Sequence, residues 1–277
     1  MLEAKLYSLT IGEVLDKVLQ FDGKTLIFFD TETTGLEPNN SYEQLTQIAA
    51  VVVDGSTWKI LDSLNEKIAK TDATNRLMDD PNSPEAKAYQ KDSDRWMRKY
   101  KKPYMHPREV MQMTHYDAGV PMENRIDEKS ALIKFEELLA KYPDAILVAH
   151  NAVFDMKVTN ARRRINGLPP IPRHAVLDTL KIARFFFVPL LQAMESNDWA
   201  KEMLTGLLAK TKYKSYSTTL GKLAAVFKIQ LDNWHDAGAD IKMLIGILEQ
   251  TIKLLKTHRD IDISKFQKVQ GKRYRKF

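Results

Sequence analysis

The sequence predicts an α/β protein with a mixed five-stranded sheet and helices on both faces. Two observations predict it. Residues 24–68 contain three strand-like runs in close succession, which is typical of antiparallel neighbours. From residue 130 onward, strand-like runs alternate with helical patterns, which is typical of parallel strands joined by helices. The chain has 277 residues, 44% of them apolar, so it can bury a core of this size.

The first part of the chain begins with a helix over residues 10–20. Thr10 and Glu13 have the spacing of a capping box, and an apolar stripe follows at helical period. After a turn at Asp22-Gly23, residues 24–29 form a fully apolar run, as expected of a buried central strand. Residues 47–54 and 59–68 predict the second and third strands, with a tight hairpin turn at Asp54-Gly55.

The second part alternates helices and strands. Its predicted elements are a helix over 130–141, a strand over 145–151, a helix over 154–165, a short strand over 175–180 that runs into a helix, a helix around 220–227 and a long final helix over 241–255. Gly167 and Pro169 end the helix over 154–165.

Two segments fit this frame poorly and are predicted to be insertions, about residues 71–105 and 188–216. The first contains a helix start, with Ser83 at the N-cap and Pro84 at the first helical position. Segments of this kind often carry binding function. We expect one domain over residues 1–277, with an N-terminal helix within 1–22 and a basic tail at 268–277.

Composition narrows the function classes. The chain has no cysteine, which excludes disulfides, thiolate metal sites and a cysteine nucleophile. The start does not resemble a signal peptide and no run suits a membrane span, so a cytoplasmic protein without membrane contact is expected. The net charge of +6 is compatible with a polyanionic partner. Basic stretches with interleaved aromatics lie at 95–108, 210–216 and 268–277, and each is either a nucleic-acid contact or a solvated face.

Acidic residues gather at the predicted element ends. Asp30 and Glu32 share one face of a strand, where their charges repel. A bound divalent cation would offset that repulsion, and a solvated turn would also tolerate it. Asp155 stands where a strand gives way to a helix, and His235 and Asp240 stand at the start of the last helix. Taken singly, these three also suit a helix N-cap, a capping or packing histidine and a first-turn acid.

Together these residues form three ordered motifs. They are D-T-E-T-T-G-L at 30–36, H-N-A-V-F-D at 150–155 and H-D-A-G-A-D at 235–240, with D-T-L at 178–180 before the third. The chain thereby resembles the DEDDh family of 3′–5′ exonucleases, which have the ribonuclease H-like fold. The resemblance covers about residues 24–255. The N-terminal helix, the two insertions and the basic tail depart from the family, and its "HGIT"-like element is blurred to M-T-H-Y-D at 113–117.

The resemblance implies a two-metal hydrolysis of phosphodiester bonds with Mg²⁺ or Mn²⁺. Asp30 would bridge both ions, Glu32 and Asp240 would bind the ion that holds the attacking water, and Asp155 would act on the second. His235 would be the general base. The residues expected beside the substrate are Thr33, Leu36, Asn151 and Phe154, with Gly35 letting the backbone approach the 3′ nucleotide. Plain core packing is the alternative for Leu36 and Phe154.

The expected function is a metal-dependent 3′–5′ exonuclease that releases nucleoside monophosphates from single-stranded DNA or frayed 3′ ends. A 3′–5′ exoribonuclease is the alternative, because contacts to the 2′-OH decide between DNA and RNA and do not show in a sequence. A non-catalytic nucleic-acid-binding protein is disfavoured because all five catalytic positions are intact. Since no polymerase segment is evident in the chain, proofreading would require a separate polymerase or repair partner.

Overall fold

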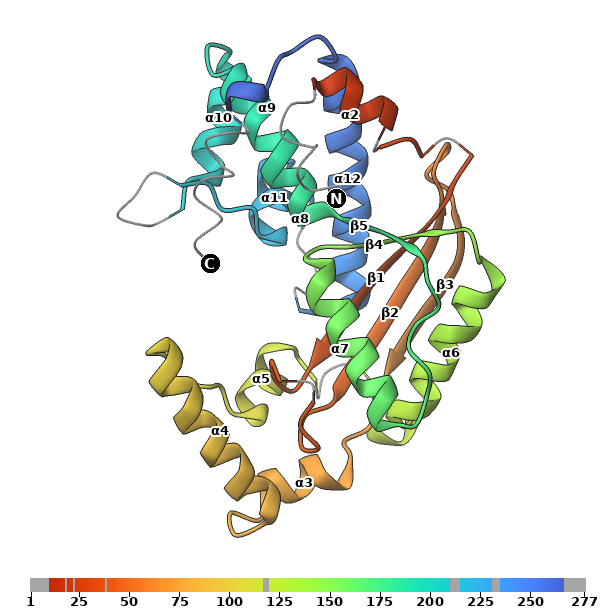
Figure 1. Cartoon of the computed structure of the whole chain (residues 1–277), viewed down its shortest axis with the longest axis vertical. Helices are drawn as coiled ribbons and strands as arrows, with labels where there is room; N and C mark the ends of the chain where they lie inside the picture. The colour runs from red at the N-terminus through yellow and green to blue at the C-terminus, as the bar shows by residue number, and fades with distance from the viewer. Residues whose placement is uncertain are drawn as a thin grey trace.

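The computed structural model describes residues 10–266, except residues 18, 22, 38, 117–119, 210–214 and 231–234. It confirms the mixed five-stranded sheet, with the spatial order β3-β2-β1-β4-β5 (Figure 1). β2 is antiparallel to β1 and β3, whereas β4 is parallel to β1 and β5. The strands are β1 (Thr25–Thr33), β2 (Leu45–Asp54), β3 (Ile60–Lys67), β4 (Ile146–Ala149) and β5 (Ala175–Asp178).

The helices follow the predicted order. They are α2 (Ile11–Lys17), α3 (Asp72–Asp79), α4 (Pro84–Tyr100), α5 (Pro107–Met113), η2 (Met122–Asn124), α6 (Glu128–Lys141), α7 (Ala152–Ile165), α8 (Thr179–Ile182), the π-helical turn η3 (Ala183–Phe187), α9 (Val188–Ala193), α10 (Asp198–Leu207), α11 (Leu220–Val226) and α12 (Ala237–Thr257). Ser83 caps α4 as predicted, with its hydroxyl accepting from the Ala86 amide.

The end of β1 and the β2–β3 connection differ from the prediction. β1 continues four residues beyond the apolar run, because its polar end still pairs with β2 as far as Thr33. The β2–β3 connection is a hairpin but not a two-residue turn. The Asp54 carboxylate accepts the amides of Ser56 and Thr57, and Trp58 turns the chain with φ of 58°.

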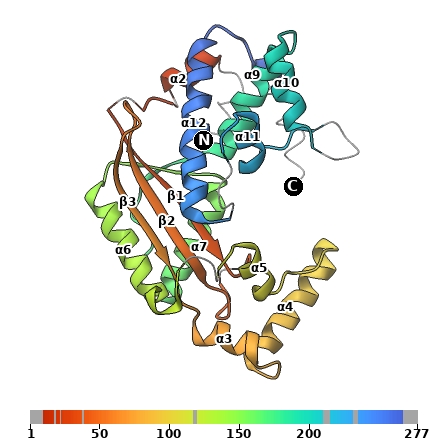
Figure 2. The ribbon, with the colours of Figure 1, turned by 180° about the vertical axis from the view of Figure 1, so that it is seen from behind.

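Helices cover both faces of the sheet, as predicted. Figures 1 and 2 show α6 and α7 on one face and α12 on the other. The alternation in β1 explains this: Leu26 and Phe28 lie in the core cluster shared with α12 and α2, whereas Ile27 and Phe29 lie in the cluster shared with α6 and α7. The sheet is therefore buried on both sides at β1, the strand that carries the first motif.

The two predicted insertions behave differently. The segment from η3 to α11 forms a third apolar cluster against α12, with buried residues that include Phe187, Leu204 and Leu223. By contrast, α4 has no buried residue, and Figure 1 shows it standing away from the sheet beyond α3 and α5. The second insertion is thus an extension of the core, and the first is an arm.

Parts of the basic predictions lie outside the described residues, namely 210–214 and the tail at 268–277. Among the described residues, no helix is both long enough and apolar enough to cross a bilayer.

Candidate active site

The first motif extends past the end of its parallel neighbour. β1 pairs with β4 from Leu26↔Ile146 to Phe28↔Val148, so Asp30 and Glu32 lie just beyond that ladder. They share the face of Phe28, which is the face that α12 covers. The chain thus brings both carboxylates to the edge where β4 ends.

Asp155 reaches the same edge from α7. After β4, Asn151 adopts the left-handed conformation with φ of 71° and forms the N-cap of α7, which puts Asp155 in the first turn. Its Oδ1 accepts from the Thr31 amide at 3.2 Å and from the Thr31 hydroxyl at 2.8 Å. The side chain is buried, at 2% exposure. Asp155 is therefore not an N-cap but is fixed against β1 at Thr31, the residue between Asp30 and Glu32 in the sequence.

The third motif is held by a polar network at the start of α12. Asp236, not His235, is the N-cap and accepts from the Ala239 amide at 3.1 Å. Its other oxygen accepts from Lys67 at 2.7 Å and from Gln47 at 3.2 Å. A Cβ on Gly238 would lie 2.8 Å from Asn65 Nδ2, so the absence of a side chain lets β3 approach α12. This network anchors the start of the helix that carries Asp240.

Glu32, His235 and Asp240 meet at this point. Each offers one ligand atom such that all three lie within 4.8 Å of one another. His235 turns the chain with φ of 68° immediately before the N-cap, which explains how its ring reaches the same space as Asp240. The structure thus brings together residues that are more than 200 positions apart.

Four buried acids dominate the electrostatics of the site. Burial, then the charges of Asp155, Glu32 and Asp240, raise the pKa of Asp30 well above its usual value. Burial and the charge of Asp240 raise the pKa of Glu32 to about 8. Burial raises the pKa of Asp155 to about 7, against the opposing hydrogen bonds from Thr31. Burial likewise raises the pKa of Asp240 to about 7. The four carboxylates share one field, which a cation would relieve.

These residues fit a divalent cation. Oδ1 of Asp240 is buried and has no hydrogen-bond partner among the described residues, which is costly unless another ligand occupies its lone pairs. The donors around it are hard carboxylate oxygens, the type that Mg²⁺ and Mn²⁺ prefer.

The four residues expected beside the substrate have different surroundings. Leu36 is 50% exposed, so the core-packing alternative is wrong for it. Asn151 is exposed, and its side chain makes no cap bond. Phe154 is half-buried against the core on the α6–α7 side. Thr33 is buried, and its hydroxyl donates to the Gly35 carbonyl at 2.7 Å, so it shapes the loop that carries Leu36.

That loop is fastened by two residues that sequence reasoning missed, Glu43 and Tyr104. The buried Glu43 carboxylate accepts from the Glu37 amide at 2.7 Å and from the Tyr104 hydroxyl. The same hydroxyl accepts from the amides of Leu36 at 3.3 Å and Glu37 at 3.2 Å. A Cβ on Gly35 would lie 2.5 Å from the Glu43 carboxyl carbon, so this glycine is required by Glu43.

The D-T-L element supports the second motif. The Asp178 carboxylate accepts from the amides of Asn151 and Leu180, both at 3.1 Å. The Thr179 hydroxyl contacts His150 Nδ1 at 3.0 Å and donates to the Ala149 carbonyl at 3.2 Å. His150 also contacts the Thr218 carbonyl through Nε2 at 2.9 Å, so it links the start of α8 to the segment before α11, while Thr179 links α8 to the end of β4.

A third missed residue is His115, in the M-T-H-Y-D segment. Burial first, and then the nearby charge of His115, lower the pKa of His235. The histidine of the M-T-H-Y-D segment was the sequence signal that could have identified it.

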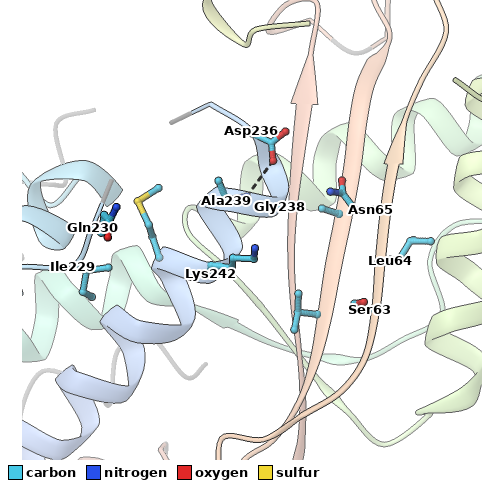
Figure 3. Close-up of a pocket in the computed structure, with 12 residues that line it drawn as sticks. Ser63, Leu64, Asn65, Ile229, Gln230, Asp236, Gly238, Ala239 and Lys242 are labelled. Atoms are coloured by element: carbon cyan, nitrogen blue, oxygen red, sulfur yellow. Dashed lines mark hydrogen bonds between the residues drawn. The ribbon is translucent and has the colours of Figure 1, made fainter. Parts of the chain in front are cut away.

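A pocket of about 460 Å³ lies beside the third motif, between β3 and the start of α12, with Asn65, Asp236 and Lys242 in its lining (Figure 3).

Comparisons with known proteins agree with this arrangement. The family model RNase_T, described as Exonuclease, matches residues 27–79. A DNA polymerase III PolC-type from Ureaplasma parvum is 30% identical over 165 residues, which is 59% of this chain and 9% of that protein. The PolC-type polymerase of Pediococcus pentosaceus is 25% identical over 205 residues, 74% of this chain and 11% of that one. The chain thus spans about a tenth of the length of these relatives.

Solved structures show a similar fold. E. coli Exonuclease I in complex with a dT13 oligonucleotide has a TM-score of 0.56 at 17% identity, over 82% of this chain and 40% of that one. Cell-death related nuclease 4 has a TM-score of 0.51 at 15% identity, over 83% of this chain and 64% of that one. The mixed sheet and its helices therefore match folds of the ribonuclease H-like type.

Proposed function

Because the chain resembles the DEDD-type 3′–5′ exonucleases in its motifs, its fold and its family match, we propose that it is a metal-dependent 3′–5′ exonuclease acting on single-stranded or frayed ends of DNA. In this proposal residues 1–277 act as one exonuclease domain. The observation that carries it is the meeting of Glu32, His235 and Asp240 within 4.8 Å, in the field of Asp30 and Asp155.

The four acids would hold the metal. Asp30, Glu32, Asp155 and Asp240 are proposed to bind two divalent cations, Mg²⁺ or Mn²⁺, with Asp30 shared between them. Such ions, when bound, would neutralise the negative charge on the scissile phosphate and on the leaving oxygen. The orphaned Oδ1 of Asp240 and the raised carboxylate pKa values support this assignment.

His235 is proposed to take the proton of the attacking water at a ring nitrogen. Its lowered pKa favours the neutral imidazole at neutral pH, which is the form that a general base needs. Its position before the N-cap of α12 keeps its ring close to Glu32 and Asp240.

The exposed residues beside the acids would orient the strand. Leu36 would lie against the terminal base, and Asn151 and Phe154 would line the path of the strand, with Thr33 beside the last nucleotide. The half-exposed Leu36 on a hydrogen-bonded loop supports this role. DNA is the proposed substrate because the similar chains are DNA polymerases and a nuclease solved with a dT13 oligonucleotide. A DNA polymerase or repair complex is the proposed partner.

The test is a panel of end-labelled strands with Mg²⁺, Mn²⁺ or chelator. A 3′-labelled DNA single strand should release labelled mononucleotide at once, and a 5′-labelled strand should shorten progressively. Asp30→Asn should abolish both, because the shared ligand loses its charge, while strand binding persists. Equal hydrolysis by Asp30→Asn and wild type in Mg²⁺ would overturn the metal assignment. Faster trimming of matched RNA than of DNA would replace the DNA proposal with the exoribonuclease.

A further inference from the structure

The arm formed by α4 displays aromatic rings at the surface. Trp96 and Tyr100 lie one helical turn apart, with ring centroids 4.2 Å from each other. Trp96 also contacts Tyr104, at 5.0 Å between centroids. Tyr100 is 45% exposed, and the 17-residue helix buries none of its own residues. These rings are therefore not there to fill a core.

The rings line a small pocket that has cations at its rim. The pocket has a volume of about 110 Å³ and includes Arg95 and Lys99, with the acids Glu37 and Asp92 also in its lining. The Lys99 ammonium lies 4.8 Å from the centroid of the Tyr100 ring, and Arg95 pairs with Asp92 at 3.2 Å. Arg98, Lys101 and Lys102 are exposed nearby in the chain, which leaves the end of α4 positive. The volume suits one planar ring rather than a whole nucleotide.

The pocket is continuous with the loop that carries Leu36. Tyr104 lines the pocket with its ring, and its hydroxyl accepts from the amides of Leu36 and Glu37. Glu37 lines the pocket as well. A strand whose 3′ end reached Leu36 and the four acids would thus have this pocket beside it.

We propose that Trp96 and Tyr100 form a stacking subsite for one base of single-stranded DNA, upstream of the 3′ end, with the basic residues of α4 facing its phosphates. The occupant follows from the chemistry: the half-exposed Tyr100 ring, supported by Trp96, can stack on a base of any sequence, and the basic residues around it suit a phosphate backbone. The subsite adds a strand-binding contact to the proposed nuclease site. Its placement upstream of the 3′ end rests on the proposed function.

Binding in chelator tests the subsite without hydrolysis. Tyr100→Ala should weaken binding of oligothymidylates about 10-fold, or about 1.4 kcal/mol, because stacking on one base is lost. Tyr100→Phe keeps the ring and should bind like wild type. A dinucleotide, which occupies only the 3′ end, should bind both variants equally. Because Tyr100 is the last residue of α4 and largely exposed, both variants should fold, which circular dichroism would verify.

Fluorescence gives a second readout. A base stacked at the subsite should quench Trp96, so Trp96→Phe should lose part of the quenching that long strands produce. Trp199→Phe is the matched control, because Trp199 stacks on His258 in another part of the molecule. Lys99→Gln should lower the slope of log affinity against log salt by about 0.7, the value for one phosphate contact on a single strand.

The outcomes separate the two proposals. Wild-type affinity of Tyr100→Ala for long strands, with unchanged quenching in Trp96→Phe, would overturn the subsite whatever the nuclease activity, and would favour docking of a protein on α4. Loss of long-strand affinity in Tyr100→Ala would support the subsite even if the wild-type protein hydrolysed no strand. In that case only the proposed nuclease function would fail.

Discussion

At the scale of single residues, the site is defined by charges that oppose folding. Four carboxylates converge; burial raises the pKa of each, and the charges of the neighbouring site acids raise those of Asp30 and Glu32 further. Asp155 accepts two hydrogen bonds from Thr31, which partly offset the effect of burial. In the metal-free protein, ionisation of these buried acids therefore destabilises the folded state, and a bound cation would remove that effect.

The raised pKa values predict that the stability of the protein in chelator depends on pH. Glu32, Asp155 and Asp240 ionise near pH 4 when unfolded but near 7 to 8 when folded, and the pKa of Asp30 is also raised, so between these values the folded state binds more protons. Stability should then fall as pH rises from about 4 to about 8. The window from about 7 to 8 is the informative one, because His106, His150 and His235, whose pKa values are lowered in the folded state, are mostly neutral there in both states.

Thermal melts in chelator at several pH values would measure this fall. Asp30→Asn should reduce it, since one of the mutually repelling charges is gone, and Mg²⁺ should restore the lost stability in the wild type only. A melting temperature in chelator that rises between pH 7 and 8 would contradict the raised pKa values of the four acids.

His235 can be tested by its removal. His235→Ala should lower the hydrolysis rate by roughly 10²–10⁴, the usual contribution of a general base. The acidic limb of the pH–rate profile should flatten, and Mn²⁺ affinity should survive. Because His235 also lies within ligand reach of Glu32 and Asp240, the metal measurement matters. A lost Mn²⁺ affinity with an unchanged pH profile would make His235 a ligand instead.

At the scale of elements, the arm formed by α4 and the loop that carries Leu36 form one unit. The Tyr104 hydroxyl connects the segment after α4 to Glu43 and to the backbone at Leu36. Further contacts reinforce the connection, because the Tyr42 hydroxyl donates to Asp92 of α4 at 2.7 Å. The position of Leu36 therefore depends on a helix outside the sheet.

Tyr104→Phe should loosen that unit while keeping the ring. The variant leaves the buried Glu43 carboxylate without one donor, so stability should fall by about 1–3 kcal/mol. KM for DNA should rise with kcat nearly unchanged, because the hydroxyl touches loop backbone and not the four acids. Tyr89→Phe is the matched control, since its hydroxyl donates to the Tyr104 carbonyl and not to the loop. A fall in kcat at constant KM would assign Tyr104 to the chemical step.

The elements also show what a sequence can predict. Periodicity located the five strands and the helices around them, and the spacing of Asp30 and Glu32 placed two acids on one face. The end of β1 was missed because its last residues are polar and serve the site. Glu43 and Tyr104 were missed because they are 61 positions apart in segments without periodicity, and only tertiary packing joins them. The stretch 95–108, which contains Trp96, was singled out as basic with interleaved aromatics, but the sequence could not separate a nucleic-acid contact from a solvated face.

At the scale of the whole molecule, a buried ion pair joins the layer of helices that carries Asp155. Arg162 of α7 contacts both oxygens of Glu128 of α6, at 2.8 Å each, and both side chains are 3% exposed. Glu128 also accepts from the Leu45 amide at the start of β2. This pair therefore fixes two helices and a strand relative to one another.

Removing one partner of this buried ion pair should strongly destabilise the protein. Arg162→Met should lower the free energy of unfolding by about 3–5 kcal/mol, because it leaves the Glu128 carboxylate buried without its cation. Lys141→Met breaks the exposed pair with Asp62 and should change it by at most about 1 kcal/mol. Urea titrations would compare the two. An equal loss in both variants would contradict the account of the buried pair.

The start of α12 has a consequence for synthesis on the ribosome. It supplies His235 and Asp240, and its Asp236 must reach back 189 positions to Gln47 to be anchored. Because the amino-terminal part of a chain emerges first, β1 and α7 are made long before α12 can dock. A nascent chain thus carries Asp30, Glu32 and Asp155 without the rest of the constellation. In the proposed function, hydrolysis would therefore begin only after α12 has been synthesised and has docked on the sheet.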